Sequence, residues 1–195
     1  MVFLNGLNSA LKYDFQDFSI VPNPQTNISS RKDIKMTLKT DTNYNTLPLF
    51  VAPMDSVIDY NNLNCFIESD LRICLPRQAD DKPFEFGFAK YISKHGVFYS
   101  VGLNQFRNLI YEKHVEGFGK FFVLLDIANG HIEKLVDYIK DFKQRYPKAV
   151  LMVGNIAHPK TFGILGAAGA DYIRVGIGGG QACTTSANVA IHFPI

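Results

Sequence analysis

Six short apolar runs, separated by segments with a helical pattern, constrain the fold of this chain more than any other feature. The runs have the length of strands and are apolar throughout rather than at every second position, which is typical of strands covered on both faces. Strands of that kind indicate a parallel sheet. The runs span residues 47–53, 70–76, 96–102, 120–126, 149–155 and 171–176.

The segments between these runs carry the spacing of amphipathic helices. In the clearest of them, apolar residues recur at offsets 0, 3, 4, 7 and 10 from Ile132, and charged residues fill the other face. Pro147 is expected to end this helix. Alternating strands and helices predict an open doubly wound sheet or a (β/α)8 barrel, and the pattern alone does not separate the two. Weaker helical patterns cover residues 58–68, 83–94, 105–114 and 159–168.

The first 48 residues differ from the rest because they are polar and rich in Asn, Ser and Thr. We expect an N-terminal extension over residues 1–48, packed on the barrel, and six βα units over residues 49–195. Apolar residues make up 47% and charged residues 19% of the chain, which excludes a disordered polyelectrolyte. No apolar run approaches the roughly 18 to 20 residues of a membrane-spanning helix. The N-terminus also lacks the basic leader of a secretory signal, so a cytoplasmic protein is expected.

Charge and cysteine content narrow the range of partners. The formal net charge is +2 and Lys and Arg are scattered among acidic residues, so neither a nucleic-acid nor a membrane partner is expected. The three cysteines, Cys65, Cys74 and Cys183, cannot all pair and match no CxxC metal pattern, which indicates reduced thiols. Cys65 lies in an apolar helical stretch and Cys74 in a strand, and both are expected in the core.

The glycine-rich loop over residues 176–185, GIGGGQACTT, is the segment most suited to chemistry. In both architectures ligands bind beyond the carboxyl ends of the strands, and this loop follows the sixth run. Closely spaced glycines allow positive φ and let the backbone approach an anion or offer carbonyls to a cation. The loop completes neither a P-loop nor the GxGxxG fingerprint. Cys183 is a candidate nucleophile there, with a small buried residue as the alternative.

Five ordered motifs resemble the IMP dehydrogenase and GMP reductase family. The longest, GADYIRVGIGGGQACTT, resembles the catalytic loop of that family, with glycine and Gln181 where the family pattern has proline and serine. The resemblance implies a (β/α)8 TIM barrel that binds a purine 5′-monophosphate and a nicotinamide cofactor. With about six of eight units the barrel is incomplete, so we expect either a longer gene product or a complementing C-terminal chain. The other motifs read DFQDFSIVPNPQTNISSRKDI, APMDSV, LLDIANGH and MVGNIAHP.

The resemblance also implies roles for individual residues. Cys183 would attack purine C2, and the hydroxyl of Thr185 would work with an acid/base partner. His131 and His158 are interpreted as helix-start residues rather than bases. The implied cofactor contacts are Ser30, Arg31, Arg77, Asp126, Asn155, Ile177 and Gly178, with Asp126 at the nicotinamide ribose. The implied substrate contacts are Met54, Arg174 and Gln181, and the implied potassium site is formed by Gly178, Gly180 and Cys183.

The resemblance favours the reductase over the dehydrogenase. The chain has no room after the second run for the CBS modules that IMP dehydrogenases usually carry, and LLDIANGH has the reductase form, whereas APMDSV and IRVG lean towards the dehydrogenase. We therefore expect NADPH-dependent reductive deamination of GMP to IMP through a thioimidate on Cys183. The alternatives are an NAD-dependent IMP dehydrogenase without CBS modules, which makes XMP, and a truncated non-catalytic homologue that binds nucleotide. A homotetramer with bound K+ is also implied.

Overall fold

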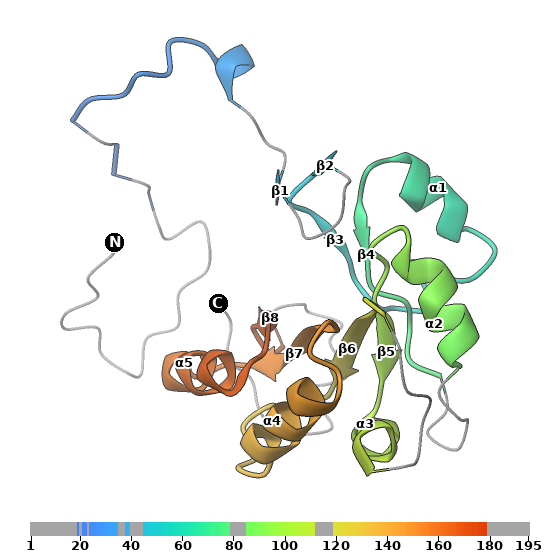
Figure 1. Cartoon of the computed structure of the whole chain (residues 1–195). Coiled ribbons are helices and arrows are strands. Elements are labelled where there is room, and N and C mark those ends of the chain that lie inside the picture. The colour runs from blue at the N-terminus through green and yellow to red at the C-terminus, as the bar shows by residue number, and fades with distance from the viewer. Residues whose placement is uncertain are drawn as a thin grey trace.

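The computed structural model describes residues 19, 21–22, 24–34, 38–39, 45–78, 85–111 and 119–178. Short strands and helices alternate along most of this part of the chain (Figure 1). The strands are β1 (Leu38–Lys39), β2 (Asn45–Thr46), β3 (Phe50–Val51), β4 (Arg72–Ile73), β5 (Tyr99–Val101), β6 (Phe122–Asp126), β7 (Val150–Ile156) and β8 (Tyr172–Val175). The helices are the 3-10 turn η2 (Arg31–Asp33), α1 (Leu63–Glu68), α2 (Phe86–Ser93), α3 (Leu103–Tyr111), α4 (Leu135–Arg145) and α5 (Pro159–Ala168).

Strands β3 to β8 lie side by side in the order in which they occur along the chain. β3 pairs with β4 in parallel, a parallel bridge between Cys74 and Phe98 links β4 to the segment before β5, and β5, β6, β7 and β8 form one parallel sheet. A doubly wound sheet reverses its strand order at a switch point, and the described strands contain no reversal. The parallel α/β prediction is confirmed, and the strand order is that of a (β/α)8 barrel.

The strands bury both faces, as their continuous apolar runs predict. Along β6, Val123 and Leu125 join the cluster that includes the helices, whereas Phe122 and Leu124 join a second cluster that contains no helix residue. Two separate apolar clusters on opposite faces of one sheet are the arrangement of a barrel wall, with the smaller cluster on the inside. The inner cluster consists of Cys74, Phe98, Phe122, Leu124, Val150 and Met152, with Tyr172 packed against it.

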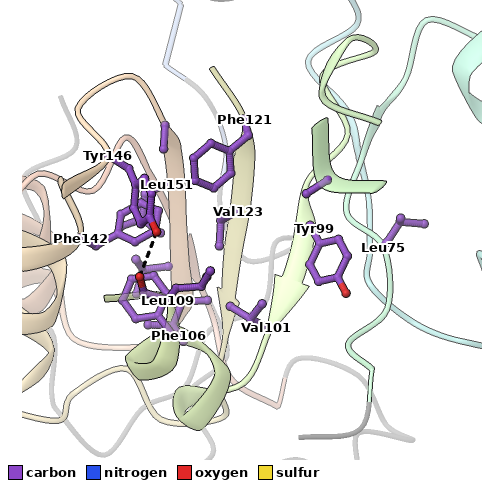
Figure 2. Close-up of a cluster of buried hydrophobic side chains, with 14 of the residues drawn as sticks. Leu75, Tyr99, Val101, Phe106, Leu109, Phe121, Val123, Phe142, Tyr146 and Leu151 are labelled. Carbon is purple, nitrogen blue, oxygen red and sulfur yellow. Dashed lines mark hydrogen bonds between the residues drawn. The ribbon is translucent and has the colours of Figure 1, made fainter. Parts of the chain in front are cut away.

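The outer cluster fixes α3 and α4 against the sheet. The rings of Phe106 and Phe142 stack with their centroids 4.9 Å apart, and Phe121 meets Tyr146 edge to face. The Tyr146 hydroxyl donates to the Leu109 carbonyl at 3.1 Å, so the polar end of this buried ring is satisfied (Figure 2). The packing thus holds both helices on the outer face of the sheet.

Arg72 places a cation inside the inner cluster. It is 2% exposed, its guanidinium lies 4.9 to 5.6 Å from the centroids of the Phe50, Phe98 and Tyr172 rings, and its Nη1 donates to the Tyr172 hydroxyl at 2.7 Å. Its Nη2 has no hydrogen-bond partner among the described residues. The aromatic faces and one hydroxyl therefore carry the stabilisation of this buried charge.

Tyr172→Phe is expected to lower the free energy of unfolding by about 1.5–3 kcal/mol, because it removes the acceptor of a buried charged donor and little else. Urea denaturation followed by circular dichroism measures the change. Tyr91→Phe is the matched control, since Tyr91 is 57% exposed, and we expect a change within about 0.5 kcal/mol. Equal stability of the two variants would contradict this account of Arg72.

The helix after β7 follows its prediction because its ends are encoded locally. The His158 ring caps α5 by accepting a hydrogen bond from the Lys160 amide at 3.1 Å, and Pro159 is the first residue of the helix. Gly169 ends the helix with φ of 115°. This confirms His158 as a helix-start residue. Cap, proline and glycine are signals that do not depend on distant contacts.

Two other helices depart from their predictions. α4 begins at Leu135 rather than at residue 132, and Ile132 is 39% exposed, because the preceding loop is bonded to β7 through the Gly130 amide. α1 begins at Leu63 rather than at residue 58, because the Asp59 carboxylate accepts from the amides of residues 61 and 62 and holds a turn there. Local side-chain bonds of this kind compete with helix formation.

Cys65 corrects the expectation that it lies in the core, because it is exposed. α1 buries Leu63 and half-buries Phe66 and Ile67. Cys65 follows Leu63 by two residues, which places it on the opposite side of the helix. A short amphipathic helix buries only one of its faces, so a residue within an apolar stretch can still be exposed. Within the described residues no helix has the length and apolar character needed to cross a membrane.

Candidate functional site

An ion pair spans the carboxyl ends of three strands. Asp126 at the end of β6, Gly154 in β7 and Arg174 in β8 are register partners in one row. Arg174 Nη1 donates to Asp126 Oδ1 at 2.5 Å, and the two side chains are 27% and 25% exposed. Because the middle member of the row has no side chain, the long guanidinium side chain can reach across β7. The pair is a partly buried polar group at the edge where barrel ligands bind.

Glycine is required at residue 154 for a second reason, which is that the neighbouring strand leaves no space for a Cβ. A Cβ at this position would lie 2.6 Å from Arg174 Cβ and 2.7 Å from the Arg174 carbonyl oxygen. Both atoms belong to the neighbouring strand and cannot rotate away. The close approach of β7 and β8 at this level therefore depends on glycine.

The side chain of Asn155 connects β7 to the start of the glycine-rich loop. Its Nδ2 donates to the Gly176 carbonyl at 2.8 Å, while its backbone bonds to Ile127 and Gly130 in the loop after β6. The Gly176 amide in turn donates to the Ile156 carbonyl at 2.7 Å. Three consecutive strand ends are thus joined by hydrogen bonds at the site.

The glycine-rich loop begins as the sequence predicts. Gly176 and Gly178 have φ of 108° and 80°, which confirms positive φ at the two positions that the structure describes. Ile177 between them is 2% exposed and anchors this turn in the protein. Residues 179–195, with Gly180, Gln181, Cys183 and Thr185, lie outside the described residues.

The other predicted contact residues fall into two groups. Met54 follows β3 and is 53% exposed, and Arg77 follows β4 and is exposed, so both lie beyond carboxyl ends of strands in the same wall. Ser30 caps η2 with its hydroxyl, and Arg31 is exposed on that turn. Figure 1 shows this blue segment well apart from the strand ends, so the structure does not bring Ser30 and Arg31 to the site. It does bring together Asp126, Asn155, Arg174, Ile177 and Gly178.

Cys74 is buried in the barrel wall, in the inner cluster. Burial raises the pKa of its thiol from 9.0 to about 12, against the opposing effect of the Arg174 charge. Its Sγ lies 3.9 Å from Met152 Sδ in the inner cluster. The thiol is therefore protonated at neutral pH, and the core prediction for Cys74 is confirmed.

His131 differs from its prediction. It lies in the loop after β6, four residues before α4 begins, so it does not start that helix. Its ring contacts the loop after β7 instead, with Nε2 at 3.1 Å from the Ala157 amide nitrogen. Sequence reasoning missed this contact and the need for glycine at residues 130 and 154. A glycine inside a strand-like run was the available signal for the second.

Arg174→Met is expected to lower the free energy of unfolding by about 1–3 kcal/mol, because Asp126 is left partly buried without its cationic partner. The double variant with Asp126→Asn is expected to recover part of this loss. Urea denaturation of the wild type, both single variants and the double variant gives the coupling energy. Additive effects of the two substitutions would show that the pair contributes nothing.

A family model described as the IMP dehydrogenase / GMP reductase domain matches residues 110–194, which include β6 to β8 and the glycine-rich loop. Over this segment the chain is similar to the IMP dehydrogenase/GMP reductase family. The strand ends that carry Asp126, Asn155 and Arg174 all lie within the matched segment. The site described above therefore lies in the segment that resembles this family's domain.

Curated relatives support the same family. The chain is 31% identical over 176 residues to a GMP reductase of Lactobacillus acidophilus, covering 89% of this chain and 52% of the relative. It is 29% identical over 188 residues to a GMP reductase of Lactobacillus delbrueckii subsp. bulgaricus, covering 93% and 55%. The chain spans about half the length of these relatives.

A solved structure confirms the fold. The crystal structure of inosine 5′-monophosphate dehydrogenase from Legionella pneumophila matches with a TM-score of 0.66 and 24% sequence identity. The match covers 94% of this chain and 56% of that chain. The described strands and helices thus have the arrangement of part of a (β/α)8 barrel wall.

Proposed function

We propose that this chain carries the part of a purine nucleotide oxidoreductase that binds the cofactor and supplies the nucleophile, and that the reaction is the NADPH-dependent reductive deamination of GMP to IMP. The observation that carries the proposal is the site itself. The Asp126–Arg174 pair and the Asn155-held glycine-rich loop meet at the carboxyl ends of β6 to β8, in a segment that matches the family model. Relatives named GMP reductase favour the reductase.

The proposed reaction uses Cys183 as a covalent nucleophile. Its thiolate adds to C2 of GMP and forms a C–S bond, and the exocyclic amine leaves as ammonia after taking up a proton with the help of Thr185. NADPH, when bound, supplies a hydride to C2. The C–S bond then breaks, IMP leaves, and the sulfur is again a thiolate.

The described residues fit a nicotinamide cofactor. Asp126 uses Oδ1 for Arg174, and its Oδ2 has no partner among the described residues, so it can accept from a ribose hydroxyl. Asn155, Ile177 and Gly178 would form the wall beside the nicotinamide, and Arg77 would reach its phosphates or adenosine. Ser30 and Arg31 would contribute only if their segment approaches the site in the bound state.

Substrate and ion contacts complete the proposal. Met54 and Arg174 would lie against the purine, and Gln181 would hold its phosphate. The carbonyls of Gly178, Gly180 and Cys183 would bind K+, because backbone carbonyl oxygens suit a hard cation. The enzyme would act in the cytoplasm.

The proposed assembly is a homotetramer or a complex with a complementing C-terminal chain. Eight strands close a barrel of this kind. The described wall ends at β8, where the side chains are half-buried or exposed, whereas those of β5 are all buried. Further βα units would cover this edge.

A dehydrogenase is the second candidate, because the matching crystal structure is an IMP dehydrogenase. In that reaction Cys183 would add to C2 of IMP, the hydride would pass from C2 to NAD, and water would hydrolyse the thioimidate to XMP. A non-catalytic nucleotide-binding homologue is the third.

Absorbance of the reduced nicotinamide separates these candidates. The isolated chain is expected to be weakly active or inactive, and in an assembly that completes the barrel we expect it to consume NADPH with GMP and to release ammonia in equal amount. Formation of NADH from IMP and NAD would show the dehydrogenase instead. Calorimetric binding of GMP without turnover in either assay would show the non-catalytic homologue and would contradict the proposed reaction.

A further inference from the structure

The ring of His131 lies between the loops that follow β6 and β7. Its Nε2 is 3.1 Å from the Ala157 amide nitrogen and 3.2 Å from the His158 amide nitrogen. Its Nδ1 is 2.7 Å from Asn129 Oδ1. One side chain therefore bonds to two separate loops at the edge of the site.

The partners fix the state of this ring. Backbone amides can only donate, so Nε2 must present a lone pair to Ala157 and His158. Asn129 Oδ1 also accepts from the His131 amide at 3.1 Å, so it is an acceptor for the ring as well. The hydrogen must then sit on Nδ1, and the ring is neutral in this arrangement.

The residue next to His131 carries the connection to the glycine-rich loop. The Gly130 amide donates to the Asn155 carbonyl at 2.7 Å, and Asn155 Nδ2 donates to the Gly176 carbonyl at 2.8 Å. A Cβ at Gly130 would lie 2.6 Å from Ile156 Cγ2, so the two loops are in direct contact there. The His131 ring and Asn155 thus belong to one set of bonds that ends at the first glycine of the loop.

We propose that His131 is a positioning residue: its Nδ1–H tautomer joins the loop after β6 to the loop after β7 and thereby holds Asn155 and the Gly176 carbonyl in place. Among the described residues, the hydrogen bonds of the ring go to Asn129, Ala157 and His158. Its action on the site passes through Gly130 and Asn155. The catalytic consequence rests on the proposed function, whereas the tautomer and the joining of the loops do not.

Two measurements on the wild-type protein and its variants test this proposal without turnover. Nitrogen chemical shifts of the His131 ring are expected to show hydrogen on Nδ1 and a lone pair on Nε2. In His131→Phe, which keeps a ring but removes the acceptor, hydrogen exchange of the Ala157, His158 and Gly130 amides is expected to accelerate roughly 3- to 10-fold, as for loss of about one hydrogen bond. His131→Gln places an amide oxygen near the position of Nε2 and is expected to restore the slow exchange.

Controls and the kinetic readout separate this role from a general loss of structure. His95→Phe removes a histidine at the end of α2 and is expected to leave the three amides unchanged. Where turnover is present, kcat is expected to fall roughly tenfold in His131→Phe at nearly unchanged KM for GMP, and to recover in His131→Gln.

Hydrogen on Nε2 in the wild type, or equal rates of amide exchange in the Phe and Gln variants, would overturn the proposal. If His131→Phe fails to fold, the wild-type tautomer and the Gln variant decide. Absent turnover in the wild type counts against the proposed reaction and leaves the tautomer and exchange results to judge His131.

Discussion

Gly154→Ala is expected to cost about 3 kcal/mol or more of the free energy of unfolding. The added Cβ would meet Arg174 Cβ at 2.6 Å and the Arg174 carbonyl oxygen at 2.7 Å. Neither atom can move without separating β7 from β8, and overpacking against rigid neighbours costs about 1–3 kcal/mol or more. The same separation would pull Arg174 from Asp126. Urea denaturation gives the loss in stability, and circular dichroism shows whether the variant folds.

Gly163→Ala is the matched control for this prediction. Gly163 lies in α5, and a Cβ there would meet no atom within 4 Å. Because glycine in a helix is less favourable than alanine by about 0.5–1 kcal/mol, this variant is expected to be slightly more stable than the wild type. Opposite signs at the two glycines are the expected result. A Gly154→Ala protein as stable as the control would contradict the close approach of β7 and β8.

Cys183→Ala is expected to abolish the proposed turnover, with a loss of about 10³-fold or more, as when a covalent nucleophile is removed from other enzymes. The physical reason is that neither of the other two cysteines can replace it. Cys74 is buried with a raised pKa, and Cys65 lies exposed on α1, away from the strand ends of the site. The measurement is the rate of NADPH consumption with GMP.

Cys65→Ala is the control for this loss, because it removes an exposed thiol and is expected to retain the wild-type rate. Cys74→Ala is expected to lower the free energy of unfolding, because packing against Met152 is lost. The folded fraction of this variant is expected to keep the wild-type rate. Turnover that persists in Cys183→Ala would remove the proposed nucleophile from the mechanism.

The fold could be predicted from the sequence where the signals are local. The strand β6 and the helix α5 follow their apolar run and their capping residues, His158 and Gly169, nearly residue by residue. The choice between an open sheet and a barrel could not be made from periodicity, because strand order is a long-range property. It follows from the parallel bridge between Cys74 and Phe98, two residues far apart in the sequence.

The sequence could predict which residues lie at the ends of the strands, but not the contacts between them. Asp126 and Arg174 could be placed at strand ends, but their ion pair depends on a register that brings both beside Gly154. His131 was misinterpreted because its partners are backbone amides of a distant loop. Nearly every residue has a backbone amide, so the sequence gives no signal for such a contact. The role of Asn155 at the Gly176 carbonyl was hidden for the same reason.

The central claim is that Cys183 forms a covalent bond to the purine at this site. Mass spectrometry of the protein incubated with GMP, quenched in acid and digested, tests it most directly. We predict a Cys183 peptide that carries the mass of GMP less ammonia, and loss of this adduct when NADPH is added before the quench. An unmodified Cys183 peptide after incubation with GMP alone, from a preparation that turns over once NADPH is supplied, would contradict the claim, as would the same adduct on Cys65 or Cys74.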